Sequence, residues 1–207
     1  MNRLLNSMSR FDFVENEKLR NQLDFIIECD KAKNVFRRTV LTDSSRREND
    51  AEHSWHLALC AMTLFEYAPE GADLGRTVQM VTVHDLVEIY AGDTFAYDIQ
   101  GNSTKSEREN DAANRLFGML GEQGETLRSL WNEFEKCETP TALYARALDC
   151  LQPLLHNYIT EGYTWRGNHI TTEMVLNRNA ACRKAMPEVW KIVEKIVEDS
   201  HKKGLLE

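Results

Sequence analysis

The sequence predicts an all-α protein, and three observations support this fold class. Apolar residues recur at helical spacing through most of the 207 residues. The dipeptides Asn-Gly, Asp-Gly and Gly-Gly, which are the strongest signals of a β-hairpin, do not occur. Residue types that begin and end helices also stand at the expected boundaries. We therefore expect a helical bundle.

Periodicity divides the first half of the chain into helices at about residues 15–34, 50–68 and 72–91. The apolar residues that repeat along them are Leu19, Leu23, Ile26 and Ile27, then Trp55, Leu59, Met62 and Leu64, then Leu74, Val78, Val81 and Leu86. Asp50 is the expected N-cap of the second helix, and Pro69 with Gly71 separates it from the third. Gly92 stands where a helix end favours a left-handed residue.

The second half begins with residues 92–104, the longest segment without periodicity, and a loop of this length suggests a function. The helices expected after it cover about residues 104–120, 124–137, 140–161, 171–184 and 187–202, of which the 171–184 helix is short. Pro153 lies inside one of them, and a proline frees the carbonyl four residues earlier and bends the axis. We expect a kink there that helps to present Asp149.

Length and composition favour one soluble domain over residues 1–207, with a core at about 15–165 and the helices of 171–202 packed on it. A domain of this size buries roughly 70% of its unfolded surface. Lys and Arg total 25 against 33 Asp and Glu, a net charge of −8 that argues against a duplex nucleic acid as partner. The N-terminus shows no targeting segment, and no stretch reaches the ~20 apolar residues that cross a membrane.

Five cysteines without a Cys-x-x-Cys pair indicate reduced thiols, so we expect a cytoplasmic protein. Apolar and aromatic residues of the C-terminal helices, including Trp165 and Trp190, are consistent with a homodimer.

The most informative motif is His84-Asp85 followed by Glu88 in a strongly apolar stretch. Ionisable side chains in such a place are costly unless they are paired or bind a metal. On one continuous helix His84 and Glu88 would share a face, with Asp85 offset by about 100°. A cation between His84 and Asp85 would then have Glu88 one turn away.

Two further residues could complete a metal site. His53 stands at the start of another expected helix, and Asp149 is flanked by small and apolar residues, although Glu138 or Glu161 could replace it if the helices packed differently. Two imidazoles and two carboxylates suit a divalent transition ion better than a hard ion such as calcium. His56, one turn after His53, is interpreted as structural.

The order His53, then His84-Asp85, then Asp149 resembles the His…His-Asp…Asp signature of the HD-domain superfamily of metal-dependent phosphohydrolases. Its bacterial 5′-deoxynucleotidase branch is more similar still. The segments that resemble this branch are Arg46-Arg47-Glu48-Asn49-x-x-Glu52-His53 and His84-Asp85-x-x-Glu88-x-x-x-Gly92-Asp93, and Arg38 matches the position of a substrate-binding arginine. The resemblance covers about residues 15–165.

This resemblance implies a single HD-domain helical bundle with one divalent metal ion, which could be manganese, cobalt, zinc, iron, nickel or magnesium. The implied metal ligands are His53, His84, Asp85 and Asp149. The implied activity is hydrolysis of a small phosphomonoester, most similar to that of a 5′-deoxynucleotidase, by water that the metal activates.

The same resemblance implies roles for residues around the metal. Glu88 and Asp93 are the catalytic candidates, and Arg38, Asp93 and Arg46 are the substrate-binding candidates. Arg46 and Lys105 are by default surface cations. Thr39 stands where the branch has an aromatic residue against the sugar, so selectivity between deoxyribose and ribose stays open. The alternative is a non-catalytic HD module that binds a metal, a nucleotide or a protein partner.

Overall fold

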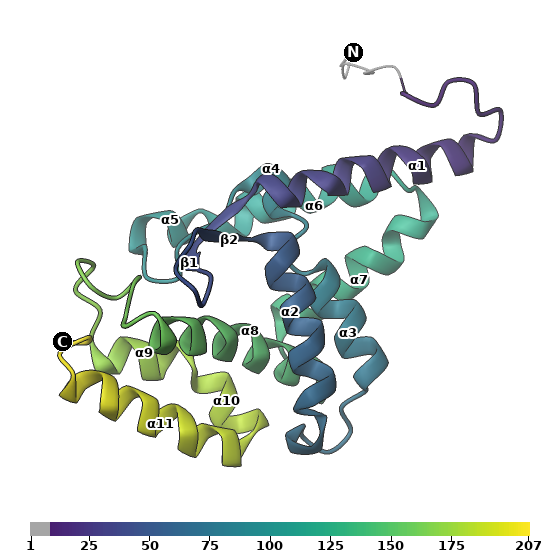
Figure 1. Ribbon diagram of the computed structural model, residues 1–207. Coiled ribbons are helices and arrows are strands. Elements are labelled where there is room, and N and C mark those ends of the chain that lie inside the picture. Colours follow the sequence, from purple (N-terminus) through teal and green to yellow (C-terminus); the bar gives the residue numbers. More distant parts are fainter. Residues whose placement is uncertain (1–8) are drawn as a thin grey trace.

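The computed structural model describes residues 9–207, and helices make up most of the protein (Figure 1). The α-helices are α1 (Glu17–Cys29), α2 (Asp50–Thr63), α3 (Leu74–Val83), α4 (Glu88–Ala91), α5 (Ile99–Ser103), α6 (Lys105–Gly118), α7 (Glu122–Lys136), α8 (Pro140–Ile159), α9 (Thr172–Arg178), α10 (Ala180–Ala185) and α11 (Pro187–Lys202). Two 3-10 helices are η1 (Asp30–Asn34) and η2 (Phe65–Tyr67). The all-α class is confirmed. The predicted domain starts at residue 1, and its N-terminal segment, residues 1–8, lies outside the described residues.

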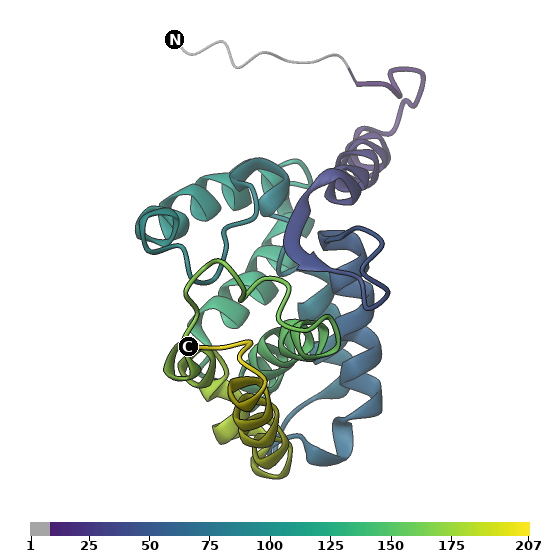
Figure 2. The same ribbon diagram turned by 60° about the vertical axis from the view of Figure 1, so that its left-hand side comes forward.

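The core is built around α8, which lies across the middle of the molecule with α2, α3, α7 and α10 against it (Figures 1 and 2). Its side chains Tyr144 and Leu148 are fully buried. The Tyr144 hydroxyl donates a hydrogen bond of 2.9 Å to the Ala61 carbonyl of α2, which satisfies the one polar atom of this ring. Helix α11 adds Val193 and Val197 to the same core.

A smaller apolar cluster lies on the other side of the site and joins α4, α6 and α7. Val87, Leu116, Phe117 and Trp131 are its main buried members. Helix α1 contributes only the partly buried Phe25 to the edge of this smaller cluster. It runs along the outer side of the molecule, and none of its side chains is buried (Figure 2).

The helix expected over residues 72–91 is two helices, because α3 ends at Val83 and α4 begins at Glu88. The His84 imidazole Nδ1 lies 2.9 Å from the Val81 carbonyl oxygen. The Asp85 amide would bond to this carbonyl in a continued helix, and the chain turns through residues 84–87 instead. The expectation that His84 and Glu88 share one helix face is therefore wrong, although both side chains still face the same site. Gly92 ends α4 at φ 76°, as its position predicts.

The N-cap of α2 also differs from the expectation. Asn49, not Asp50, takes the extended conformation of an N-cap, and its side chain accepts a hydrogen bond of 3.0 Å from the Glu52 amide. The Glu52 carboxylate accepts from the Asn49 amide in return, which completes a capping box. The Asp50 carboxyl therefore does not cap α2, and it lies buried beside the site.

A short antiparallel hairpin precedes α2, and the sequence signals did not predict it. Strand β1 (Phe36–Val40) pairs with β2 (Arg47–Asn49), with Phe36 opposite Asn49 and Val40 opposite Arg47. The register shifts between these two pairs, and the loop is longer than a two-residue turn, so the usual hairpin dipeptides are not required. This hairpin presents Arg37, Arg38 and Thr39 to the site.

Two further expectations concern the second half of the chain. The segment 92–104 contains the short helix α5, and residues 93–97 before it line the site together with Asn102 of the helix. Helix α8 continues through Pro153 to Ile159, so the proline does not end it, and the bend at this point stays a prediction.

All five cysteines are free thiols. Within residues 9–207, no helix combines the length and the apolar composition that a membrane span needs.

Candidate functional site

The four predicted metal ligands converge, although they come from α2, the turn after α3, and α8. His53 Nε2 lies 3.2 Å from Asp149 Oδ1 and 3.8 Å from Asp85 Oδ2. His84 Nε2 lies 3.1 Å from Asp85 Oδ2 and 3.8 Å from Asp149 Oδ1. Each histidine therefore faces both carboxylates, as a shared ligand set requires.

The outer nitrogen of each imidazole is already bonded to the protein. His84 Nδ1 donates to the Val81 carbonyl at 2.9 Å, and His53 Nδ1 lies 3.2 Å from Gln152 Oε1. The Nε2 atoms are left facing the carboxylates, and His84 Nε2 is buried with no hydrogen-bond partner. A buried polar atom without a partner is costly. Two imidazole nitrogens and two carboxylates fit a divalent transition ion.

The pKa values of His84, Asp85 and Asp149 also favour a cation site. Burial opposes the charged form of His84, but Asp85 and Asp149 outweigh it and raise the pKa of His84 to about 10. Burial raises the pKa of Asp85, but His84 and Arg37 more than compensate and bring it well below the ordinary value. Asp149 behaves similarly, with Arg178 as the strongest opposing charge and a pKa far below its usual range. The carboxylates are thus ionised and ready to hold a cation.

A second group of acids lies beside this set. Asp50, Glu88 and Asp93 offer oxygen atoms that lie within 4.8 Å of one another. Burial and the neighbouring acids raise the pKa of Glu88 well above its ordinary value, and burial raises that of Asp93. Both Asp50 oxygens and Glu88 Oε2 are buried without hydrogen-bond partners. Glu88 is therefore a carboxyl group that gains and loses a proton at an unusually high pH.

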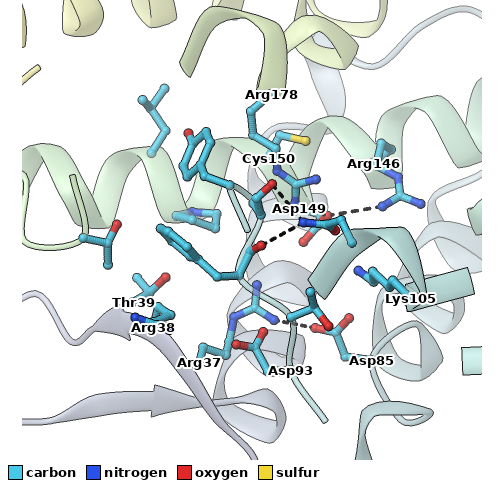
Figure 3. Close-up of a pocket in the computed structure, with 18 of the residues that line it drawn as sticks. Arg37, Arg38, Thr39, Asp85, Asp93, Lys105, Arg146, Asp149, Cys150 and Arg178 are labelled. Carbon is cyan, nitrogen blue, oxygen red and sulfur yellow. Dashed lines mark hydrogen bonds and ion pairs between the residues drawn. The ribbon is translucent and has the colours of Figure 1, made fainter. Parts of the chain in front are cut away.

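Except for His53 and Asp50, which lie behind it, these groups line one pocket, which Figure 3 shows in close-up. Five cations line it: Arg37, Arg38, Lys105, Arg146 and Arg178. Arg37 Nη1 lies 2.6 Å from Asp85 Oδ2, and Arg178 Nη2 lies 3.2 Å from Asp149 Oδ2 (Figure 3). These arginines neutralise part of the acidic charge and leave further N–H groups for an anionic ligand.

Aromatic and apolar side chains also line the pocket. They include Phe95, Tyr97 and Trp165 together with Pro153 and Leu154. The rings of Phe95 and Tyr97 meet edge to face with centroids 5.3 Å apart. Such a surface suits a flat ring more than a second charged group. The pocket thus combines charged groups with aromatic surface.

The other predicted residues divide between the pocket and the surface. Arg38 and Asp93 line the pocket, and the Arg38 guanidinium lies 5.3 Å from the Phe95 ring centroid. Arg46 does not line it. Its guanidinium is exposed and forms an ion pair of 2.5 Å with Glu52 at the start of α2, so the structure does not bring it to the other substrate-binding candidates.

The alternatives to Asp149 are also placed elsewhere. Glu138 and Glu161 are exposed, and neither lines the pocket. His56 does not join the two histidines of the converging set, because its Nδ1 lies 3.2 Å from Gln152 Nε2 instead. Thr39 lines the pocket at the position where the resemblance would place an aromatic side chain.

Sequence reasoning missed Arg37, Arg146 and Arg178, and it interpreted Lys105 as a surface residue. Arg146 had a local signal, because it lies one helical turn before Asp149, and its Nη1 is 3.6 Å from that carboxylate. Arg37 could have been found only by choosing between two adjacent arginines. Arg178 had no signal, since it reaches the site only through the packing of α10 on α8 and of α9 against α10.

The fold and the converging His, His-Asp and Asp residues define a known class. Residues 29–190 match the family described as the HD domain, and the chain belongs to this family. A crystal structure from Magnetospirillum magnetotacticum MS-1, described as a predicted metal-dependent phosphohydrolase, aligns with a TM-score of 0.84 at 46% identity. The alignment covers 92% of this chain and 98% of that one. These similarities support a phosphohydrolase of the HD-domain type.

Curated relatives point to a more particular relationship. The 5′-deoxynucleotidase HDDC2 of Dictyostelium discoideum is 27% identical over 147 residues, which are 68% of this chain and 77% of that protein. The human 5′-deoxynucleotidase HDDC2 is 27% identical over 138 residues, 66% of each chain. The expected relationship to HD-domain 5′-deoxynucleotidases is confirmed at this level of similarity.

Proposed function

We propose that the protein hydrolyses a small phosphomonoester, a nucleoside 5′-monophosphate, with a divalent metal ion. The observation that supports this most directly is the pocket itself. Members of a ligand set for one cation, several arginines and aromatic rings line the same pocket. A nucleotide has the matching chemistry, with a dianionic phosphate and a flat base. The class of enzyme would be a phosphoric monoester hydrolase of the 5′-nucleotidase type.

His53, His84, Asp85 and Asp149 are the proposed ligands, and the bound ion would lower the pKa of a water molecule and screen the phosphate oxygens. The ion could be manganese, cobalt, zinc, iron, nickel or magnesium. The chain itself selects among them only by its mixed nitrogen and oxygen donors, because the order of affinity is similar for most such sites.

The cations that line the pocket would hold the phosphate. Arg178 and Arg146 both approach Asp149 from α9 and α8, and Lys105 faces the same space from the start of α6 (Figure 3). The planar guanidinium of arginine can give two parallel hydrogen bonds to phosphate oxygens. Arg38, beside the Phe95 ring, is the proposed contact for the sugar or the base edge.

Glu88 is the proposed proton-transfer residue and Asp93 its neighbour at the substrate. The raised pKa of Glu88 suits a group that accepts a proton from water and returns it to the leaving oxygen. Its buried Oε2 has no other partner, so it is free for this task. Asp93 lies in the segment after α4 that lines the pocket, where a sugar hydroxyl could bond to it.

A metal-reconstitution assay tests the proposal. Protein stripped with a chelator should release no phosphate from a panel of monophosphates, and it should regain activity with manganese or cobalt. The double variant His84→Ala/Asp85→Ala should stay inactive in the same assay. His169→Ala is the matched control, because this imidazole is exposed and pairs with Glu207 away from the pocket.

Activity at the parent rate in the double variant would refute the catalytic assignment. Metal binding without phosphate release from any monophosphate would favour the non-catalytic HD module instead. The panel should contain ribose and deoxyribose forms of each nucleotide, because Thr39 leaves room where an aromatic residue would crowd the sugar. A single domain over residues 1–207, a cytoplasmic location and a homodimer stay predictions.

A further inference from the structure

A buried polar network lies behind the metal ligands and is not explained by the proposed function. Its centre is Gln152 of α8, one turn after Asp149 and fully buried. The Gln152 Nε2 atom lies 2.6 Å from Glu48 Oε1, 3.1 Å from His156 Nε2 and 3.2 Å from His56 Nδ1. Its Oε1 atom lies 3.2 Å from His53 Nδ1.

The orientation of the Gln152 amide follows from its neighbours. Glu48 offers a carboxylate oxygen, which accepts hydrogen bonds. Reversing the amide would bring two acceptor oxygens to 2.6 Å, which is unfavourable. The amide nitrogen must therefore face Glu48, and the amide oxygen must face His53.

The same reasoning fixes His156. Its Nδ1 lies 3.1 Å from the Val40 carbonyl oxygen of β1, and a carbonyl only accepts, so Nδ1 carries a proton. In the neutral ring Nε2 is then an acceptor, and it receives a hydrogen bond from the Gln152 amide. His156 is buried, so water does not compete for these bonds.

We propose that Gln152 is a positioning residue that holds His53 in the tautomer that binds the metal. The order of bonds runs from the Val40 carbonyl through His156 and Gln152 to His53. Gln152 Oε1 accepts from His53 Nδ1, so the tautomer that binds a metal carries its proton on Nδ1. Metal-binding histidines almost always donate such a bond from their other nitrogen. His53 Nε2 lies 3.2 Å from Asp149 Oδ1, its hydrogen-bond partner in the metal-free protein, and 3.8 Å from Asp85 Oδ2. A bound ion would take the place of the bond between Nε2 and Asp149.

Glu48 has a supporting role in this network. Its Oε1 orients the Gln152 amide, while Oε2 is buried without a hydrogen-bond partner and lies 3.6 Å from His53 Nδ1. That distance is too long for a hydrogen bond, so Gln152 and not Glu48 is the partner of His53. Glu48, His56 and His156 could also suggest a second metal site, but the Gln152 amide nitrogen already occupies the space between them.

Histidine tautomers can be read directly by NMR in the metal-free protein. Long-range ¹H–¹⁵N spectra should show a protonated Nδ1 on His53 and on His156, and an unprotonated Nε2 on His156. An unprotonated Nδ1 on His53 would overturn the proposal. This measurement does not depend on catalysis, so failure of the enzyme to hydrolyse any phosphomonoester would leave it unaffected.

Metal affinity tests the consequence for the site. Gln152→Met keeps a long side chain and removes the amide, and the dissociation constant for Mn²⁺ should rise about 10- to 100-fold. The matched control is Gln100→Met, because Gln100 is exposed and does not line the pocket. Wild-type affinity in Gln152→Met would overturn the proposal.

A reciprocal double variant separates positioning from general damage to the core. Glu48→Gln with Gln152→Glu exchanges the amide and the carboxylate, so an acceptor still faces His53 and a donor still faces residue 152. His156 Nε2, which accepts from Gln152 in the wild type, must then carry a proton of its own to face the new carboxylate. Its Mn²⁺ affinity should lie closer to that of the wild type than to that of Gln152→Met. An affinity as low as that of Gln152→Met would refute the assignment, and the double variant also serves if Gln152→Met does not fold.

Discussion

Replacing Arg178 by methionine should weaken substrate binding without weakening the metal site. Arg178 is one of the pocket cations, and its Nη2 lies 3.2 Å from Asp149 Oδ2 with 34% of the side chain exposed. A hydrogen bond to a charged group contributes about 1.5–3 kcal/mol, which corresponds to about 10- to 150-fold in binding. Partial exposure screens the charge, so we expect the lower end, about tenfold in kcat/KM.

The same replacement should not weaken metal binding. Arg178 repels a bound cation, and its removal leaves Asp149 with one positive neighbour fewer. Mn²⁺ should therefore bind as tightly as in the wild type or more tightly. A variant that merely damaged the packing of α9 would lose metal affinity and substrate affinity together, so the two measurements distinguish the explanations.

The assay compares phosphate release and Mn²⁺ binding in Arg178→Met and in Arg183→Met. Arg183 is an exposed arginine on α10 and does not line the pocket, so its replacement should change neither quantity. Unchanged kcat/KM in Arg178→Met would show that this residue does not contact the substrate. Weaker Mn²⁺ binding would show that its main role is to support Asp149.

Three further predictions concern the acids and the core. Glu88→Gln should keep Mn²⁺ binding and lose most turnover, because the amide cannot accept the proton. An equal loss of Mn²⁺ binding would make Glu88 a ligand. The control is Glu107→Gln on the exposed side of α6. Burial and Asp85 raise the pKa of Asp50 to about 8, so between pH 4 and 8 the folded protein holds a proton that the unfolded chain has released. The metal-free protein should therefore lose stability as pH rises through this range, and Asp50→Asn should flatten this decline in thermal melts; an unchanged slope would contradict the assignment. Leu148→Ala opens a cavity in the core and should lower the free energy of unfolding, measured in urea, by about 2–5 kcal/mol. Leu155→Ala, on the partly exposed side of α8, should lower it by less. Equal decreases would mean that Leu148 does not pack as the structure shows.

The ligand types and their order along the chain were visible in the sequence. His53, His84-Asp85 and Asp149 stand out because charged and imidazole side chains rarely occur among apolar helical residues without a partner. Helices with long periodic stretches, such as the one around Asp149, were also predictable, because periodicity is a property of the local sequence. The structure brings all four side chains to one place, and their role as ligands remains a proposal.

The sequence did not predict the end of α3 or the short hairpin, because side-chain bonds and loop geometry decide these features and apolar periodicity does not report them. Residues 84–87 continue an apolar pattern, yet the His84 side chain bonds to the Val81 carbonyl and the helix ends there. A side chain that can replace a backbone donor is not visible in a hydrophobic pattern. The short hairpin of β1 and β2 was not predicted either, because its loop has no two-residue turn signal.

The sequence by itself determined the fold class and the residues able to bind a metal, because helix periodicity and the cost of burying ionisable groups act locally. Only the tertiary structure decided which cations reach the site and how the ligands are oriented. Arg178 comes to Asp149 through the packing of α10 on α8 and of α9 against α10, and Gln152 meets His53 across 99 residues of sequence. Contacts between distant elements depend on how their buried faces fit together, and no local pattern encodes that fit.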